Sequence, residues 1–381
     1  MTATLPTSAA MPASTDATEA APLTVAFDSD QEPTVELLGG KCASLVTMTS
    51  AGMPVPPGFA ITTASYDAFL DGSGLRAEIT ACLEGLDPED IAAVDDCSAR
   101  IRAQIESRPV PQGVSDALRT AYTELQSRFE SEVPVAVRSS ATAEDLPAAS
   151  FAGQQDTYLW LTGYDAVRHH VRACWASLYT SRAILYRLKN NIPEDDLSMA
   201  VAVQKMVNAR VAGVAMTMDP GTGDRSKIAI DASWGVGEMV VSGLVTPDHI
   251  VLDKVVLSVV REVIGDKHAE LVPDAAGGAL VEREVEVERR TTRCLTDTEL
   301  EAVAVMAKRA EKHYRCPQDV EWALDADLPP GEDLLLLQAR PETVHSSKPT
   351  AASAGPASSP TGSAGFQMPG MAAMTSGLRA R

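Results

Sequence analysis

The stretch "VPVAVRSSATAEDLPAASFAGQQDT", residues 133–157, changes character part-way along. It begins as an apolar strand and then presents Arg138, followed by a loop of small and hydroxylated residues. Such a strand end suits phosphate, because a guanidinium group forks onto phosphate oxygens and a small loop adds backbone N–H and hydroxyl donors. Taken alone, a surface loop with a solvated arginine explains the segment equally well.

The bulk composition limits the class of protein and its partners. The 381 residues, 45% of them hydrophobic, are enough for two or three domains with a sizeable core. The 52 acidic and 32 basic side chains give a net charge of −20, which repels nucleic acid and anionic membranes. The chain has neither an apolar run of about 18 residues nor a basic, apolar leader, so no membrane span or secretory signal is expected. The six cysteines form no Cys-x-x-Cys motif, so we predict free thiols in a reducing cytoplasm and no zinc site or redox pair.

Changes in pattern divide the chain into two lobes with disordered ends. Residues 1–23 and 346–381 are rich in Ala, Ser, Thr and Pro without periodicity, which predicts disordered tails. Between them we expect a first lobe over 24–197 and a second over 198–345. The fold class that this pattern indicates is α+β, with mixed or antiparallel sheets and packed helices.

Helical and strand patterns alternate within these lobes. Helical spacing dominates 75–130, and a single helix is predicted over 165–189. The second half contains short β-rich segments joined by Gly, Asp and Pro turns. Thr296 and Glu299 form a capping box that starts one further helix there.

Two glycine-containing turns supply a lysine and a glutamate. "LGGKCASL" places Lys41 behind two glycines and before a helix, but Walker A would need Gly at Val35 and Ser or Thr at Cys42. "WGVGE" places Glu238 in a tight turn, where its carboxylate could accept from a ribose hydroxyl or a lysine. For either motif alone, an ordinary helix start or β-turn is the stronger interpretation.

The pair "DVEWAL" and "LLLLQARPET" is the most informative. Asp319 and Glu321 share one face of the first strand, and Gln338 and Arg340 share one face of the second. If the strands pair, a carboxylate, an amide oxygen and a guanidinium converge, which suits Mg²⁺ and the phosphates that it carries. A structural ion pair on a sheet is the alternative.

In their order along the chain, these motifs resemble one known family. The matching segments are "LGGKCASL", "VAVRSSATAEDLPAASFAGQQDTYL", "CWASLYTSRAILYR", "VAVQKMV", "AGVAMTMDP", "GVGEMVVSGLVTPD" and "DVEWAL…LQARP". They resemble the N-terminal ATP-grasp module of phosphoenolpyruvate synthase, pyruvate phosphate dikinase and rifampicin phosphotransferase, over 35–344. The resemblance implies a two-lobed ATP-grasp fold that binds ATP and Mg²⁺.

The resemblance also implies roles for residues of the first lobe. Lys41 and Arg138 match two family residues that bind the ATP phosphates. The segment from Ser139 to Gly153 matches a flexible loop that closes over the triphosphate, with Thr142 as a further donor.

Residues of the second lobe, and of the hinge before it, receive roles in the same way. Three hinge residues match those used against adenine: Gln204, Met206 and Val207. Glu238 matches a glutamate near the ribose and phosphates, Glu321 and Gln338 match Mg²⁺ ligands, and Arg340 matches the arginine that clamps the transferring group. Small departures, such as Cys42 where Gly or Ala is usual, leave nucleotide binding intact.

One family feature is missing from the chain. Family enzymes pass the β-phosphoryl group to a histidine in a Thr-x-Gly-Gly-x-x-Ser-His signature, and neither Gly-Gly of this chain is followed by Ser-His. We therefore expect a partner subunit that carries the phosphohistidine and acceptor domains, as in phenylphosphate synthase. The reaction implied is ATP + phenol + H₂O → aryl phosphate + AMP + Pi. An ATP-binding sensor or assembly module, or a fragment of a phosphoenolpyruvate synthase-type enzyme acting on pyruvate, are the alternatives; the retained ligands favour the split enzyme.

Overall fold

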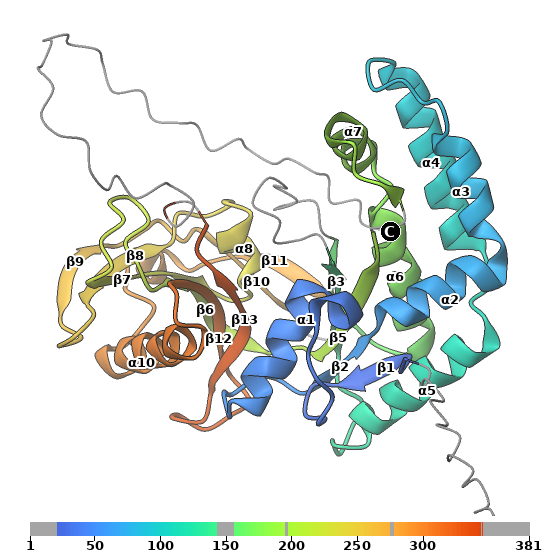
Figure 1. Ribbon diagram of the computed structural model, residues 1–381. Coiled ribbons are helices and arrows are strands. Elements are labelled where there is room, and N and C mark those ends of the chain that lie inside the picture. The colour runs from blue at the N-terminus through green and yellow to red at the C-terminus, as the bar shows by residue number, and fades with distance from the viewer. Residues whose placement is uncertain (1–20, 143–155, 195–196, 275–277, 344, 346–381) are drawn as a thin grey trace, which may run out of the picture.

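The computed structural model describes residues 21–142, 156–194, 197–274, 278–343 and 345, and shows two lobes, each built on one sheet (Figure 1). Residues 1–20 and 346–381 of the expected tails, and residues 143–153 of the expected loop, with Gly153 itself, lie outside these residues. The two-lobed α+β architecture with antiparallel sheets and packed helices is confirmed.

The first lobe is organised around a five-stranded antiparallel sheet in the order β1-β2-β5-β3-β4. Its strands are β1 (Thr24–Ala26), β2 (Gly58–Ile61), β3 (Val135–Ala141), β4 (Thr157–Leu161) and β5 (Met199–Lys205). β5 pairs with β2 and β3, so the first sheet continues beyond 197, where the sequence had placed the division. An apolar strand that is buried on both faces fits either sheet by pattern alone, which explains the misplaced boundary.

Helices cover this sheet and enclose what we call the helical core. They are α2 (Thr63–Ser73), α3 (Leu75–Leu83), α4 (Ile91–Ser107), α5 (Gln112–Gln126), α6 (Tyr164–Ser177) and α7 (Ser181–Asn190). Trp175 is fully buried in this core and stacks on Phe69, with ring centroids 4.9 Å apart. The single helix predicted over 165–189 is wrong, because Thr180 interrupts it and caps α7 by accepting from the backbone N–H of Ala183.

Two cysteines of the helical region correct a second expectation. Cys82 and Cys97 form a disulfide between α3 and α4, whereas the sequence predicted free thiols throughout. They are separated by 15 residues, so no short motif announces the pair. No helix within the described residues is long and apolar enough to cross a lipid bilayer.

The second lobe is organised around a six-stranded antiparallel sheet in the order β13-β12-β6-β7-β8-β9. Its strands are β6 (Ala209–Met216), β7 (Lys227–Trp234), β8 (Asp248–Asp253), β9 (Val259–Val263), β12 (Gln318–Asp325) and β13 (Leu334–Pro341). Helix α10 (Asp297–Tyr314) packs on one face of this sheet and begins with the predicted capping box of Thr296 and Glu299. Val320, Trp322 and Leu324 of β12 share a core with α10. The side chains that alternate with them in β12 therefore face away from α10.

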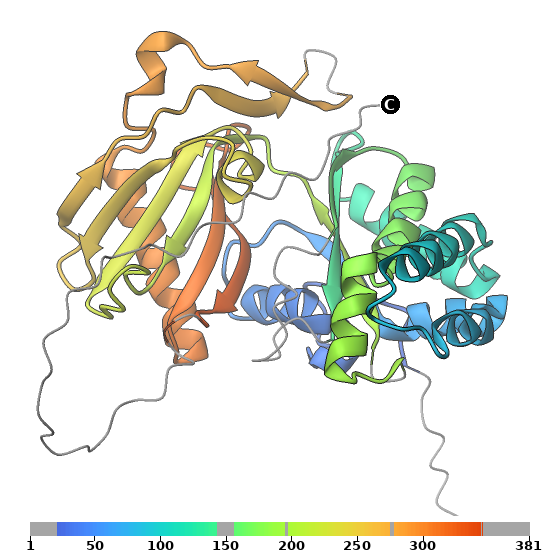
Figure 2. The ribbon, with the colours of Figure 1, turned by 90° about the horizontal axis from the view of Figure 1, so that it is seen from above.

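Shorter elements complete the second lobe. A hairpin of β10 (Ala269–Pro273) and β11 (Leu280–Glu284) extends from the sheet towards the first lobe, as Figure 2 shows. The short helix α8 (Glu238–Val241) lies between β7 and β8 along the chain, and α9 (Val287–Arg290) directly follows the hairpin. Residues 281–290, "VEREVEVERR", belong to the half of the chain expected to hold short β-rich segments, but they form the end of β11 followed by a helical turn.

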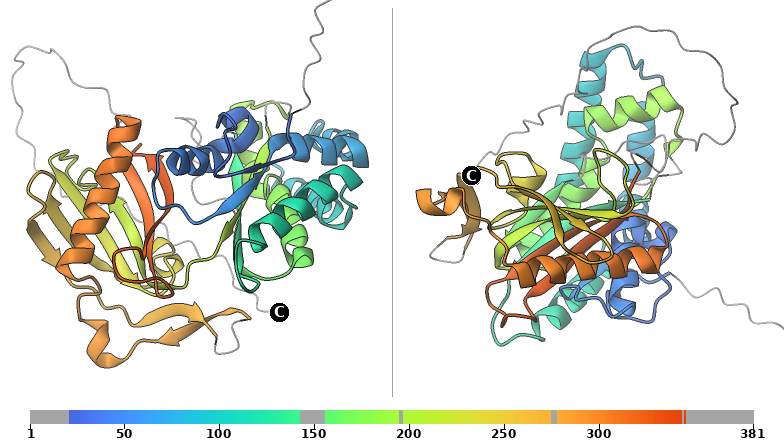
Figure 3. Two further views of the ribbon diagram at one scale, coloured as in Figure 1. Left: turned by 90° about the horizontal axis from the view of Figure 1, so that it is seen from below. Right: turned by 90° about the vertical axis from the view of Figure 1, so that its left-hand side faces the viewer.

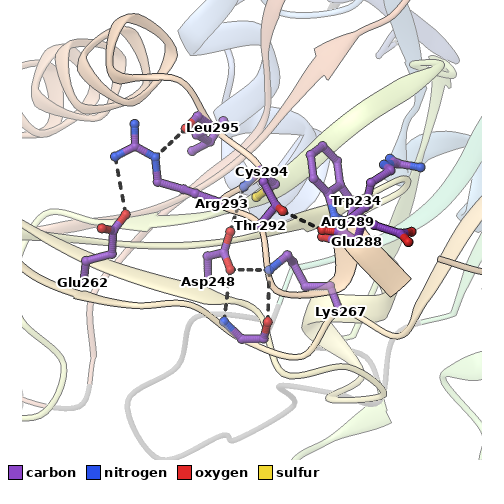
Figure 4. Close-up of polar contacts among 11 residues, drawn as sticks. Trp234, Asp248, Glu262, Lys267, Glu288, Arg289, Thr292, Arg293, Cys294 and Leu295 are labelled. Carbon is purple, nitrogen blue, oxygen red and sulfur yellow. Dashed lines mark hydrogen bonds and ion pairs between the residues drawn. The ribbon is translucent and has the colours of Figure 1, made fainter. Parts of the chain in front are cut away.

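A buried ion pair anchors the connections around β8 (Figure 4). The side chains of Asp248 and Lys267 are both fully buried and in contact. Asp248 also accepts from the backbone N–H of Gly265 at 3.0 Å and of Cys294 at 2.8 Å. Both oxygens of the Asp248 carboxylate are hydrogen-bonded, so this side chain connects β8 with the segments around Gly265 and Cys294.

Helix α1 (Val35–Ser50) joins the two lobes (Figures 1 and 3). Its Ser44 hydroxyl donates to the carbonyl of Ala339 in β13 at 2.7 Å, while the N–H of Cys42 is bonded to the Ser140 hydroxyl of β3 at 3.0 Å. The helix starts six residues before Lys41 and is kinked at Gly39, where φ is 64° and ψ is 171°. The predicted helix after "LGGK" is thus the second part of a longer, broken one.

Candidate nucleotide site

The kink in α1 positions Lys41 against β3. At Gly39 a Cβ atom would lie 2.0 Å from the carbonyl oxygen of Ser140, so only glycine permits this approach. The Ser140 hydroxyl donates to the carbonyl of Leu38 at 2.9 Å. Lys41, only 7% exposed, donates from Nζ to the carbonyl of Ser139 at 2.6 Å. Lys41 and the end of β3 therefore form one packed unit.

Arg138 extends from β3 to the second lobe. Its Nη2 donates to Oε2 of Glu321 at 3.0 Å and to Oε1 of Gln338 at 2.9 Å, and its Nη1 donates to the carbonyl of Leu337 at 3.1 Å. Glu321 and Gln338 are direct partners in the antiparallel register of β12 and β13, as their alternation predicted. Their two oxygens converge on a single cationic nitrogen, so this donor set also fits a divalent cation that shares ligands with phosphate.

Glu238 lies in the same electrostatic neighbourhood. It is the first residue of α8, and it is exposed. Desolvation of the carboxyl group, followed by the charge of Glu321, raises the pKa of Glu238, while Arg138 opposes that rise. The charges of Glu238, Glu321 and Arg138 therefore influence one another, and of these two carboxylates Glu321 is the one in contact with Arg138.

Arg340 does not join Arg138 in this contact. Its side chain is 52% exposed, and its Nε lies 3.7 Å from Oδ2 of Asp319. The guanidinium expected beside Glu321 and Gln338 is therefore supplied by Arg138, and Arg340 is displaced by one register position along the same face. Burial, more than any neighbouring charge, raises the pKa of Asp319. Asp319 was not among the predicted site residues, although its alternation with Glu321 placed it on this face of β12.

Three other predicted site residues form hydrogen bonds within the protein. The Thr142 hydroxyl donates to the carbonyl of Ser198 at 3.2 Å and accepts from its N–H at 3.3 Å. The Gln204 amide donates to the carbonyl of Pro56 at 3.3 Å and is 3% exposed. The Ser139 hydroxyl donates to the carbonyl of Asp156 at 3.4 Å. These side chains anchor strand ends in the structure as it stands.

Met206 and Val207 belong to an apolar group that we call the hinge cluster. Its most buried members come from both lobes: Ala136, Met206, Val207, Ala209, Ala212, Val236 and Ala323. Partly buried residues pack against them: Leu159, Trp160, Leu271, Leu280, Leu335 and Leu337. Met206 and Val236 each keep 8% exposure, unlike the sealed core of the first lobe. An apolar surface thus meets a cationic one at the lobe junction, which suits a flat ring joined to a phosphate chain.

Comparison with known protein families agrees with this geometry. Residues 35–359 match the family described as "Pyruvate phosphate dikinase, AMP/ATP-binding domain". The match covers most of the chain, so this chain belongs to that family, which supports the binding of ATP and a place among phosphotransferases.

Curated relatives carry phosphoenolpyruvate synthase names. The chain is 43% identical over 342 residues to a probable phosphoenolpyruvate synthase of Staphylothermus marinus, covering 84% of this chain and 41% of that protein. It is 43% identical over 318 residues to one of Methanothermobacter thermautotrophicus, covering 83% and 45%. The phosphoenolpyruvate synthase of Pyrococcus furiosus is 38% identical over 366 residues, covering 85% and 44%. The chain therefore spans less than half the length of these relatives.

Proposed function

We propose that this chain binds ATP with Mg²⁺ at the lobe junction and donates the β-phosphoryl group of ATP to a histidine on a partner subunit. The observation that carries the proposal is the contact of Arg138 from the first lobe with Glu321 and Gln338 from the second. That contact places a phosphate-binding cation and two metal-binding oxygens at one point. The hinge cluster beside it supplies an apolar surface for the base.

The residues of the chain would act mainly through charge. Glu321 and Gln338 would hold Mg²⁺, which neutralises phosphate charge and orients the triphosphate. Lys41 and Arg138 would bind phosphate oxygens from the side of the first lobe. Arg340 is exposed and one register position away, and its contact with Asp319 is long, at 3.7 Å, so we propose that it turns towards the transferring group.

The acceptor is the open part of the proposal. The names of the relatives favour pyruvate as the group finally phosphorylated. Phenol is the second candidate, by the resemblance to phenylphosphate synthase, in which a separate subunit binds the nucleotide. Both acceptors require the same first steps: histidine attacks the β-phosphorus and AMP leaves, and water then removes the γ-phosphate as Pi, which leaves the β-phosphoryl group on the histidine. We place this chemistry in the cytoplasm.

The test mixes the full chain with ATP, Mg²⁺, proteins that carry a Ser-His phosphohistidine signature, and either pyruvate or phenol. Formation of AMP that depends on the partner supports the proposal, and the acceptor that is consumed identifies the second half-reaction. ADP as product would indicate an ordinary kinase, and tight ATP binding without turnover would indicate a sensor; either result contradicts the dikinase proposal.

Two variants and a control test whether AMP formation depends on the residues of this site. Glu321→Gln and Arg138→Met should each lower partner-dependent AMP formation about 100-fold or more, by analogy with single electrostatic groups in other active sites. Arg225→Met is the control, because Arg225 is exposed in the connection between β6 and β7. Near-normal AMP formation in both site variants would show that the assignment is wrong.

A further inference from the structure

Strand β4 contains a β-bulge beside the hinge cluster. Tyr158 pairs with Val137 and Leu161 pairs with Val135, so two residues of β4 stand opposite one residue of β3. The second of those two, Trp160, has a φ of 60°. A residue with this left-handed φ is most often a glycine, because a Cβ atom is strained there.

Trp160 is unusual among the described residues. Four non-glycine residues there have positive φ, and two of them, Asn191 and Arg315, end helices. Leu257 lies in the short connection between β8 and β9. Trp160 alone among these four lies within a strand. Strained backbone persists where the side chain is needed in one place, and it gathers at ligand sites.

The bulge decides which face of the sheet receives the indole. In a regular strand, positions 158 and 160 point to the same face. Tyr158 and Leu161 pack against the helical core, whereas Leu159 and Trp160 pack against the hinge cluster. The bulge and the left-handed residue therefore turn Trp160 away from the core of its own lobe and towards the lobe junction.

The hinge cluster adjoins the cationic end of the site. Ala136, opposite the bulge, lies two residues before Arg138 in β3. Leu337 belongs to the cluster, and its carbonyl accepts from Arg138 at 3.1 Å. A base joined to phosphates at Arg138 would therefore rest on the cluster against which Trp160 packs.

We infer that Trp160 forms the aromatic wall of the base site and selects a purine nucleotide by stacking. The inference rests on the proposed binding of ATP at this junction. Indole stacking depends on the area of the base, so it favours adenine over a single-ring pyrimidine. Stacking on a base explains why a tryptophan occupies a backbone position that usually holds glycine. Nucleotide binding alone would not require an aromatic side chain there.

The experiment measures the affinity of the full-length chain for ATP, for CTP and for inorganic tripolyphosphate, which lacks a base. Trp160→Gly relieves the backbone strain but removes the ring, and Trp160→Phe retains a smaller aromatic face. The fluorescence of the four tryptophans on addition of ATP gives an independent readout. Trp234→Phe is the control, because the Trp234 indole is bonded to the carbonyl of Arg289 at 3.2 Å, away from the hinge cluster.

We expect Trp160→Gly to weaken ATP binding roughly tenfold or more, Trp160→Phe to weaken it less, and neither to change tripolyphosphate binding. The preference for ATP over CTP should shrink in Trp160→Gly. The fluorescence response to ATP should vanish in Trp160→Phe and persist in Trp234→Phe. Unchanged ATP affinity, or equal losses for ATP and tripolyphosphate, would overturn the inference while leaving the proposed function standing. Absence of ATP binding by the unmodified chain would overturn both.

Discussion

Replacement of Arg138 by methionine should loosen the junction between the two lobes in the ligand-free protein. The guanidinium, 12% exposed, makes three hydrogen bonds of 2.9–3.1 Å, all to the second lobe. Methionine fills a similar volume but donates none of them. The variant therefore separates the effect of the hydrogen bonds from the effect of packing.

The magnitude follows from the number of bonds and their exposure. Each bond from a charged donor contributes about 1.5–3 kcal/mol, so three give at most about 4.5–9 kcal/mol. Glu321 is 25% exposed, so water reaches its carboxylate and recovers part of that loss. We expect the free energy of unfolding to fall by about 2–4 kcal/mol.

The assay is urea unfolding of the full-length chain, followed by circular dichroism and fluorescence. Arg138→Lys keeps the positive charge but lacks the two guanidinium nitrogens, so it should be more stable than Arg138→Met and less stable than the unmodified protein. A double-mutant cycle with Glu321→Gln should give a coupling energy of about 1–3 kcal/mol. A loss below about 0.5 kcal/mol in Arg138→Met, or a coupling near zero, would refute the view that this contact holds the lobes together.

Three further changes test other parts of the structure. Gly39→Ala should lower the free energy of unfolding by at least about 2 kcal/mol, because its Cβ would lie 2.0 Å from the Ser140 carbonyl oxygen. The control Gly52→Ala has a similar φ of 69° but open space around it, so it should cost only about 1–2 kcal/mol. Equal losses in urea unfolding would contradict this expectation. Asp248→Asn should lower the free energy of unfolding by about 3–5 kcal/mol, because Lys267 would stay buried without its counter-charge. A loss below about 1 kcal/mol would show that Asp248 and Lys267 do not form a buried ion pair. Burial raises the pKa of Asp319 from its ordinary value of 3.8, so its ionisation costs stability as pH rises above that value. Asp319→Asn should therefore gain stability relative to the unmodified protein between pH 4 and pH 7, measured by urea unfolding at each pH, and a relative gain on acidification would have the wrong sign.

The strand pair that carries Glu321 and Gln338 could be predicted from sequence. Side chains alternate with a period of two, so face and register follow from the letters once two short strands adjoin. The capping box of α10 could also be predicted, because Thr296 and Glu299 lie close together in the sequence. The role of Arg138 in binding phosphate stays a prediction, and its partners in the structure lie 183 and 200 residues away, so no local pattern could indicate them.

The missed features are those that depend on pairing between distant segments. β5 reads as an apolar strand in any sheet, so its membership of the first lobe appears only in the fold. The break before Thr180 carried a capping signal that a continuous apolar stripe concealed. The contact of Cys82 with Cys97 and the left-handed backbone of Trp160 arise from helix packing and strand register, which short sequence windows do not contain.

The position of α1 has a mechanical consequence. This single helix touches β3 on one side and β13 on the other, and Lys41 lies next to its kink. A rotation of one lobe against the other must therefore tilt the helix that bears the lysine. Binding of a phosphate group by Lys41, as proposed above, would therefore be coupled through this helix to the angle between the lobes.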